Sequence, residues 1–229
     1  AAFLAGELRK MGYIIQEKVF GHGLIGLLPG DKKKKTVALR CDMDALPIYE
    51  ETNLSFRSNH DGVMHACGHD GHMAMILGAA KALAANKPQG SIKILCQPSE
   101  EKPPGGASGM IKSGVLENPY VDAVLGCHVS NHYSVGKIAV INGPMMAIAD
   151  NFYITLKGRG GHGALPHRNI DAIQMAAEVI VSFQHIISRQ LSTFMPAVLS
   201  FGTIHGGTAY NVMPDEVLLS GTVRCFDEN

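Results

Sequence analysis

The sequence has no tryptophan, no net charge and no apolar run long enough to cross a lipid bilayer. Its 20 basic side chains balance its 20 acidic ones, so no long-range field favours nucleic acid or an anionic membrane. The one block of like charge, DKKKKT at residues 31–36, is expected to be a solvated hairpin tip between two strands. We therefore expect neither nucleic acid nor a membrane as a partner.

The five cysteines are an odd number and lack the tight spacing of a disulfide scaffold. Cys41, Cys96 and Cys127 lie in or at the end of apolar, strand-like runs, where a free cysteine behaves as a small buried hydrophobe. This pattern indicates a reducing compartment, most simply the cytoplasm. Cys67 differs from these three because glycine and histidine surround it.

The first part of the chain alternates strand and helix patterns. Since strands with helices between them are typical of βαβ units, we expect an α/β domain over residues 1–142 with a mostly parallel sheet. Helical patterns cover residues 1–12, 72–85 and 105–116, and strand patterns cover 13–20, 23–30, 36–46, 91–97 and 121–129.

The pattern changes near Asn142-Gly143-Pro144, which we take as the junction to a second domain, residues 143–229. One strand, one long helix and two further strands predict a compact α+β unit. The strand patterns are at 151–158, 196–207 and 215–226, the helix at 169–190, and a glycine-rich loop at 158–167.

Polar side chains gather where the strands of the first domain end. Asp42 and Asp44 follow one strand, Glu100 and Glu101 follow another, and His128 follows a third. The cluster at residues 65–72 is expected in the loop just before a helix. Because ligands of open α/β sheets bind outside the carboxyl ends of the strands, these groups are predicted to converge in one cleft.

Each of these residues also has a simpler interpretation when it is taken alone. Cys67 and His69 could be an ordinary loop cysteine and an exposed histidine, and His128 could be a core histidine. Asp70 is either a helix N-cap or a residue that orients a ligand. Glu100 and Glu101 are either a surface pair or a ligand beside a general base.

Taken together, the motifs resemble the amidohydrolase branch of the aminoacylase-type metallopeptidases, which includes hippurate, N-acyl amino acid and auxin-conjugate hydrolases. The resemblance covers nearly the whole chain, with the motifs in the family's order. The matching segments are RCDMDALPI (40–48), MHACGHDGHMAM (64–75), QPSEE (97–101), PPGGA (103–107), GCHV (126–129), GRGGHGALPH (158–167) and GGTAYNVMPDE (206–216).

The resemblance implies a zinc-peptidase-like catalytic domain whose sheet is incomplete here, with an inserted lid or dimerisation domain. It also assigns roles to individual residues. Glu100 would be the general base, and His162 in the lid would meet the substrate or the developing oxyanion. Asn211 would be a second polar contact from the lid. The implied metal ligands are Cys67, His69, Glu101 and His128.

The remaining polar residues of these motifs would support the ligands. Asp44 and Asp70 would orient them, with a less defined role for Asp42, and the flanking His65 and His72 would cap, orient or pack. A thiolate, imidazoles and a carboxylate together suit divalent ions such as Mn²⁺ or Zn²⁺, with Co²⁺ or Ni²⁺ as alternatives. The resemblance implies two such ions per site.

The implied activity is metal-dependent hydrolysis of the amide bond of a small N-acyl amino acid, in a homodimer formed through the lid. The family continues beyond the point that matches Asn229 and supplies one more histidine ligand there. The chain therefore resembles an internal fragment, which we expect to be inactive or poorly folded alone. Two other functions stay open: a non-catalytic dimerisation fragment, and a cysteine hydrolase with Cys67 as nucleophile.

Overall fold

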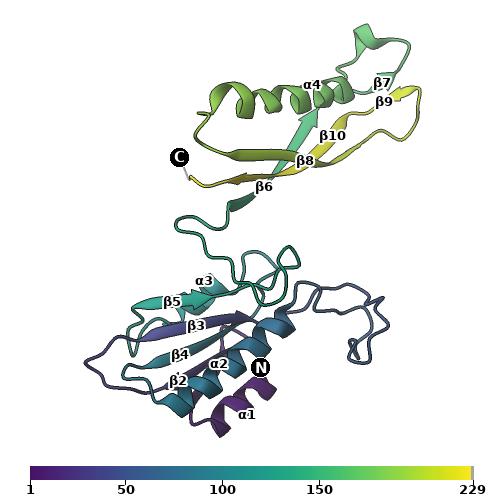
Figure 1. Ribbon diagram of the computed structural model, residues 1–229. Coiled ribbons are helices and arrows are strands. Elements are labelled where there is room, and N and C mark those ends of the chain that lie inside the picture. Colours follow the sequence, from purple (N-terminus) through teal and green to yellow (C-terminus); the bar gives the residue numbers. More distant parts are fainter. Residues whose placement is uncertain (228–229) are drawn as a thin grey trace. The chain divides into compact units, whose positions relative to one another are not determined.

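The structure, a computed structural model, describes residues 1–227 as two compact units (Figure 1). The first unit is Ala1–Gly136 and the second begins at Lys137. The sequence-based division at residues 142–143 lies slightly further along the chain. No helix among the described residues is both long and apolar enough to cross a membrane.

The first unit is built on a five-stranded sheet with the strand order β1-β2-β4-β3-β5. Its strands β3, β4 and β5 are parallel, whereas β1 pairs with β2, and β2 with β4, in the antiparallel sense. The α/β prediction is confirmed, but the sheet is mixed rather than mostly parallel. The strands are β1 (Ile14–Val19), β2 (Gly23–Leu28), β3 (Val37–Asp42), β4 (Ile92–Gln97) and β5 (Ala123–Gly126).

The predicted hairpin tip at residues 31–36 is wrong, because β2 and β3 are not neighbours. Strand β4 lies between them and pairs with both. Residues 31–36 therefore belong to the connection from β2 to β3, which passes the end of β4. Most of the segment is exposed, as its lysines require.

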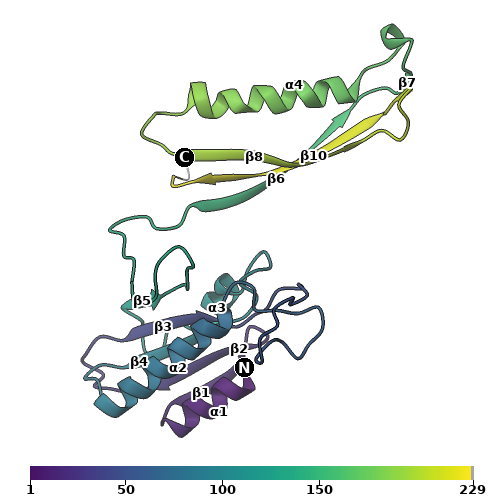
Figure 2. The same cartoon turned by 45° about the vertical axis from the view of Figure 1, so that its right-hand side comes forward.

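Helices cover both faces of this sheet (Figures 1 and 2). Side chains of α1 (Ala2–Lys10) and α2 (His69–Asn86) share one core with Ile94 and Cys96 of β4. Leu95, between these two, points to the other face and packs with α3 (Ala107–Lys112) and the segment after it. This alternation is the period of two that a strand buried on both faces must satisfy.

The register of the parallel strands brings their carboxyl ends to one edge of the sheet, which we call the rim. Asp42 pairs with Gln97, and Arg40 pairs with Gly126. The residues that follow these pairs therefore leave the sheet side by side. Helix α2 also begins at the rim, at His69 rather than at residue 72, so His69 and His72 lie in its first turn instead of in the preceding loop.

Strand β5 forms the far edge of the sheet and is exposed along its length. Cys127 follows it and is exposed as well, which contradicts its predicted burial. Cys41 and Cys96 are buried as predicted, because β3 and β4 lie inside the sheet. All five cysteines are free thiols.

The second unit is a three-stranded antiparallel sheet with the order β6-β10-β8 and one long helix on one face (Figure 2). The carboxylate of Asp171 caps α4 by accepting from the amides of Ile173 and Gln174. A π-helical turn, Ile186–Gln190, extends α4. The elements are β6 (Ile148–Lys157), α4 (Ala172–His185), β8 (Ala197–Gly206) and β10 (Glu216–Cys225).

The glycine-rich loop of the second unit contains structure that the sequence pattern did not predict. A short strand, β7 (Gly161–His162), pairs with β9 (Val212–Met213), and a 3₁₀ helix follows at Pro166–Arg168. This small ladder joins two motifs that are about fifty residues apart in the sequence.

Candidate metal centre

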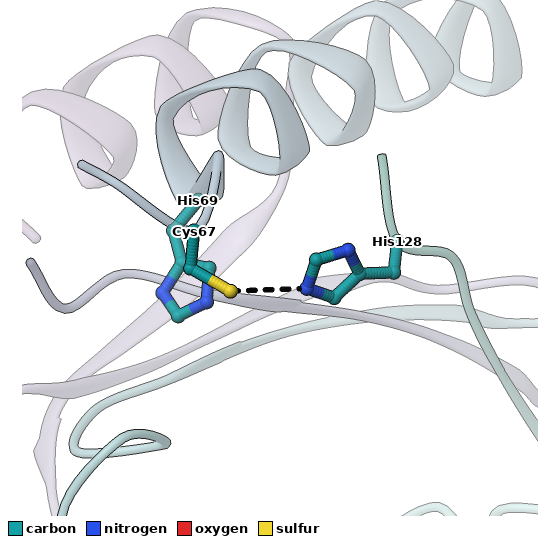
Figure 3. Close-up of side chains that lie close together, drawn as sticks. All are labelled: Cys67, His69 and His128. Atoms are coloured by element: carbon teal, nitrogen blue, oxygen red, sulfur yellow. Dashed lines mark hydrogen bonds between the residues drawn. The ribbon is translucent and has the colours of Figure 1, made fainter. Parts of the chain in front are cut away.

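The rim brings together the residues predicted to bind metal. His69 begins α2 and Cys67 lies two residues before it. Glu100 and Glu101 follow β4, and His128 follows β5. Figure 3 shows the Cys67 side chain between the rings of His69 and His128. The ligand atoms of Cys67, His69 and His128 lie within 4.8 Å of one another, and so do those of His69, Glu100 and Glu101.

His69 is buried, with a ring nitrogen left free. Its Nδ1 donates a hydrogen bond to the backbone carbonyl of Asp44 over 2.8 Å. The proton of the neutral ring therefore lies on Nδ1, and the lone pair of Nε2 faces the rim. A carbonyl bond on one nitrogen is the usual way in which a protein orients a histidine whose other nitrogen binds a metal.

Glu101 presents a buried oxygen to this nitrogen. Its Oε1 is 3.7 Å from Nε2 of His69. Asp44 holds the segment in place, because one carboxylate oxygen of Asp44 accepts from the amide of Glu101 over 3.0 Å. Asp44 thus contacts both the His69 ring and the backbone of Glu101, and this geometry supports its predicted orienting role.

Glu100 lies differently from its neighbour. Its side chain is 40% exposed against 25% for Glu101, and its Oε2 is 3.9 Å from Nε2 of His69. One carboxylate is therefore turned into the rim, and the other borders it with access to water. The two adjacent carboxylates thus differ in burial and in access to water.

Cys67 and His128 form the other side of the rim. Sγ of Cys67 is 3.3 Å from Nε2 of His128 (Figure 3). His128 donates from Nδ1 to the carbonyl of Val129 over 2.6 Å, so the lone pair of its neutral ring lies on Nε2, which accepts from the Cys67 thiol. Burial, a hydrogen bond with Glu101 and the charges of nearby carboxylates raise the pKa of the Cys67 thiol to about 11.

The described residues contain four buried side-chain polar atoms without a hydrogen-bond partner, and all four belong to rim motifs. Buried polar groups are normally paired, so such a cluster calls for a missing partner. A divalent cation would satisfy both His69 Nε2 and Glu101 Oε1, and the set of nitrogen, sulfur and oxygen donors suits a zinc-like ion. The residues present therefore fit a metal. The four atoms are Asp44 Oδ1, His65 Nδ1, His69 Nε2 and Glu101 Oε1.

In a third group with metal-binding spacing, Asp42 with His69 and His72, the donor atoms of Asp42 and His72 are already engaged. Asp42 accepts from His72 Nδ1 over 2.6 Å and from Arg40 over 2.7 Å. Burial alone would raise the pKa of Asp42, but the His72 hydrogen bond and the Arg40 charge outweigh it, and the pKa lies below its ordinary value. Asp42 therefore acts as a buried anion that holds its neighbours.

Asp70 is not the N-cap of α2. Gly68 takes that position with a left-handed φ of +81°, and the helix has no side-chain cap. The exposed carboxylate of Asp70 accepts from the amide of Gly71, and among the described residues it hydrogen bonds to none of the predicted ligands. Its predicted orienting role thus has no contact to support it, whereas its negative charge suits the first turn of a helix.

The second unit brings His162 and Asn211 together. The amide of Gly163, next to His162, donates to the carbonyl of Asn211 over 2.8 Å. His162 Nδ1 accepts from the amide of Ala164 over 3.0 Å, so a neutral ring carries its proton on Nε2. Both residues are exposed. They form a polar corner of the second unit, separate in the sequence from the rim residues of the first.

Sequence reasoning missed Arg40 and gave Asp42 and His72 no defined partners. The available signal was their spacing: Arg40 and Asp42 are two residues apart on β3 and so share a face of the strand. Arg40 also donates to Gln97 at the end of β4 over 2.9 Å, which ties two rim strands together.

The chain resembles known proteins over its whole length. An N-acyl-L-amino acid amidohydrolase from Geobacillus stearothermophilus is 45% identical over 230 residues, which cover 100% of this chain and 62% of that protein. A crystal structure from methicillin-resistant Staphylococcus aureus matches with a TM-score of 0.92 at 38% identity, covering 99% of this chain and 60% of that chain.

The YXEP protein of Bacillus subtilis, described as a dinuclear metal binding peptidase of the M20 family, matches with a TM-score of 0.80 at 35% identity. This match covers 99% of the present chain and 58% of YXEP. The chain thus spans about 60% of the length of the relatives it matches. The model of peptidase family M20/M25/M40 matches residues 38–217. The chain belongs to this family, in the amidohydrolase branch that its motifs predicted.

Proposed function

We propose that the protein is a metal-dependent amidohydrolase, with Cys67, His69, Glu101 and His128 as metal ligands and Glu100 as general base. The observation that carries this proposal is the pair of buried, partnerless atoms His69 Nε2 and Glu101 Oε1, which face each other over 3.7 Å. Leaving both unpaired would be costly in a folded protein, and a shared cation removes that cost.

A divalent ion supplies Lewis acidity to amide hydrolysis, since it polarises the carbonyl group and makes water more acidic. The chain's own residues do the rest. Glu100, partly exposed at the border of the rim, takes a proton from the attacking water and delivers it to the leaving amine. Asp44 keeps His69 and the Glu101 backbone in place while this happens.

We assign the contacts with substrate in the second unit to His162 and Asn211. What supports this role is the tautomer of His162: because Nδ1 is engaged by Ala164, Nε2–H is free to donate to a developing oxyanion. The substrate class we propose is the N-acyl amino acids, in keeping with the name of the Geobacillus relative.

We also propose that the second unit pairs with a second copy of the chain. Strand β6 is an edge strand, and the face of the sheet away from α4 exposes Tyr153 and Leu218. Sedimentation of the protein as a monomer at micromolar concentration would contradict this pairing.

A cysteine hydrolase fits the geometry poorly. A nucleophilic cysteine needs a lowered thiol pKa, whereas the surroundings of Cys67 raise its pKa to about 11. Chelation separates the two mechanisms, because it abolishes a metal-dependent activity and spares a thiol-dependent one.

The decisive variant is Glu100→Gln, which keeps the shape of the side chain and removes the base. We expect kcat for N-acetyl and N-benzoyl amino acids to fall by about 10³-fold. Zinc content should stay at the wild-type level, while the matched variant Glu101→Gln should lose zinc. A Glu100→Gln protein that keeps a tenth of the wild-type kcat would overturn the assignment of the base.

A further inference from the structure

Val129, the residue after His128, uses both of its backbone polar groups at the rim. Its carbonyl accepts the hydrogen bond from Nδ1 of His128 over 2.6 Å. Its amide donates to Nε2 of His72 over 2.9 Å. The position of this residue thus determines where the His128 ring points and which of its nitrogens carries the proton.

His72 is buried, and its hydrogen bonds fix its own tautomer. Because Nε2 accepts from the amide of Val129, the ring proton lies on Nδ1, and Nδ1 donates to Asp42 over 2.6 Å. The other oxygen of Asp42 accepts from Arg40 over 2.7 Å. Neither nitrogen of His72 is left for a metal, so the chain of contacts runs from Arg40 through Asp42 and His72 to Val129.

Two further contacts hold Val129 and His128 in place. The rings of His72 and His128 meet edge to face, with centroids 4.5 Å apart. Gly68 lies against the other side of Val129, where a Cβ at the glycine would collide with Cγ2 of the valine. The backbone just before His69 and the backbone just after His128 are therefore packed together, which brings Cys67 and His128 face to face (Figure 3).

We propose that His72 is a positioning residue for metal binding: through the amide of Val129, it holds His128 with Nε2 unprotonated and directed at Cys67. This inference rests on the proposed function, because it matters only if His128 is a ligand. His72 itself touches neither metal nor substrate. Its role is to keep a ligand, which is exposed at the end of an edge strand, in one orientation before the metal arrives.

Two substitutions separate the halves of the His72 contact. In His72→Gln, the side-chain oxygen can occupy the place of Nε2 and accept from Val129, while the donor to Asp42 is lost. In His72→Asn, the side-chain amide can occupy the place of Nδ1 and donate to Asp42, while Val129 loses its acceptor. Both variants remove the ring and each keeps one of the two contacts, so a difference between them shows whether the Val129 contact or the Asp42 contact matters more for His128.

The measurement uses chelator-treated protein labelled with ¹⁵N histidine, followed by Co²⁺ titration against a competing chelator. We expect the ring ¹⁵N shifts to place the proton of His128 on Nδ1 in the wild type and in His72→Gln, and to show mixed tautomers in His72→Asn. We expect Co²⁺ affinity to fall by less than about threefold in His72→Gln and by about 10–100-fold in His72→Asn.

Equal affinities in the two variants would overturn the proposal. The wild-type spectrum tests it even if a variant fails to fold, because a His72 proton on Nε2 rather than Nδ1 would contradict the contact with Val129. His128→Ala distinguishes this failure from failure of the proposed function. If His128→Ala binds Co²⁺ as the wild type does, His128 is not a ligand; if it binds weakly while His72→Asn binds normally, only the positioning role of His72 is wrong.

Discussion

His69 in the first unit and His162 in the second both follow a glycine, yet they differ in burial and in the ring nitrogen that is free. His69 is 1% exposed, and its Nδ1 donates to a carbonyl, which leaves a bare lone pair on Nε2. His162 is exposed, and its Nδ1 accepts from an amide, which leaves a proton on Nε2. We propose that the first ring binds a cation and that the second donates to an anion.

The difference shows that a backbone hydrogen bond to Nδ1 sets whether Nε2 of a neutral histidine is a donor or an acceptor. In both cases a single backbone contact on Nδ1 selects the tautomer, and the chemistry of Nε2 follows from it. Burial adds the second distinction. A buried nitrogen without a partner costs free energy until a ligand arrives, whereas an exposed N–H is satisfied by water until substrate replaces that water.

The largest effect is expected from removing the buried histidine. His69→Ala should lower Zn²⁺ affinity by more than about 100-fold, because losing a group that only supports a ligand already lowers metal affinity by up to about 100-fold. Competition with a chromophoric chelator measures this. The matched control is His162→Ala, which should bind Zn²⁺ as the wild type does but lower kcat by about 10²–10³-fold. Equal losses of zinc in the two variants would contradict the assignment of His69, and not His162, as a metal ligand.

The smallest effect concerns the Cys67 thiol in metal-free protein. Since the pKa of Cys67 is raised to about 11, the thiolate fraction is small at neutral pH. As the pH rises toward the pKa, this fraction increases about tenfold per pH unit. The alkylation rate of Cys67 by iodoacetamide should follow this increase, with Cys67→Ser as the control for the other cysteines. A rate that levels off below pH 9 would contradict the raised pKa.

The sequence predicted the rim because strand ends are readable from it. Apolar runs stop just before Asp44, Glu100 and His128, and parallel strands with helices between them place such stops at one edge of a sheet. The structure brings all of these residues together. Their roles came from the family's motifs rather than from spacing, since a lone Cys-x-His array or an acidic pair has an ordinary interpretation too.

The strand order could not be read in the same way. Nothing local shows that β4 inserts between β2 and β3, because that pairing is decided by the packing of the whole sheet. The same limit explains why the predicted burial of Cys127 is wrong. An apolar run predicts a strand, but only the sheet order shows that β5 is an edge strand and that Cys127, which follows it, is exposed.

The first residue of α2 and the role of His72 could not be predicted without knowing where the surrounding side chains lie. Asp70 is a good N-cap residue by type, but Gly68 holds the cap position, and Val129 leaves no room for a side chain there. The sequence predicted only that His72 would cap, orient or pack, whereas the structure shows hydrogen bonds at both of its ring nitrogens. Such partners, 30 and 57 residues away, leave no local trace in the sequence.

Anomalous diffraction at the zinc edge, from crystals of the zinc-loaded protein, tests the four proposed metal ligands directly. We expect strong peaks at the rim, at bonding distance from Sγ of Cys67, Nε2 of His69 and Nε2 of His128, with a Glu101 oxygen completing the set. Zinc bound instead by His72 and Asp42, or no zinc at the rim, would contradict the assignment of these ligands.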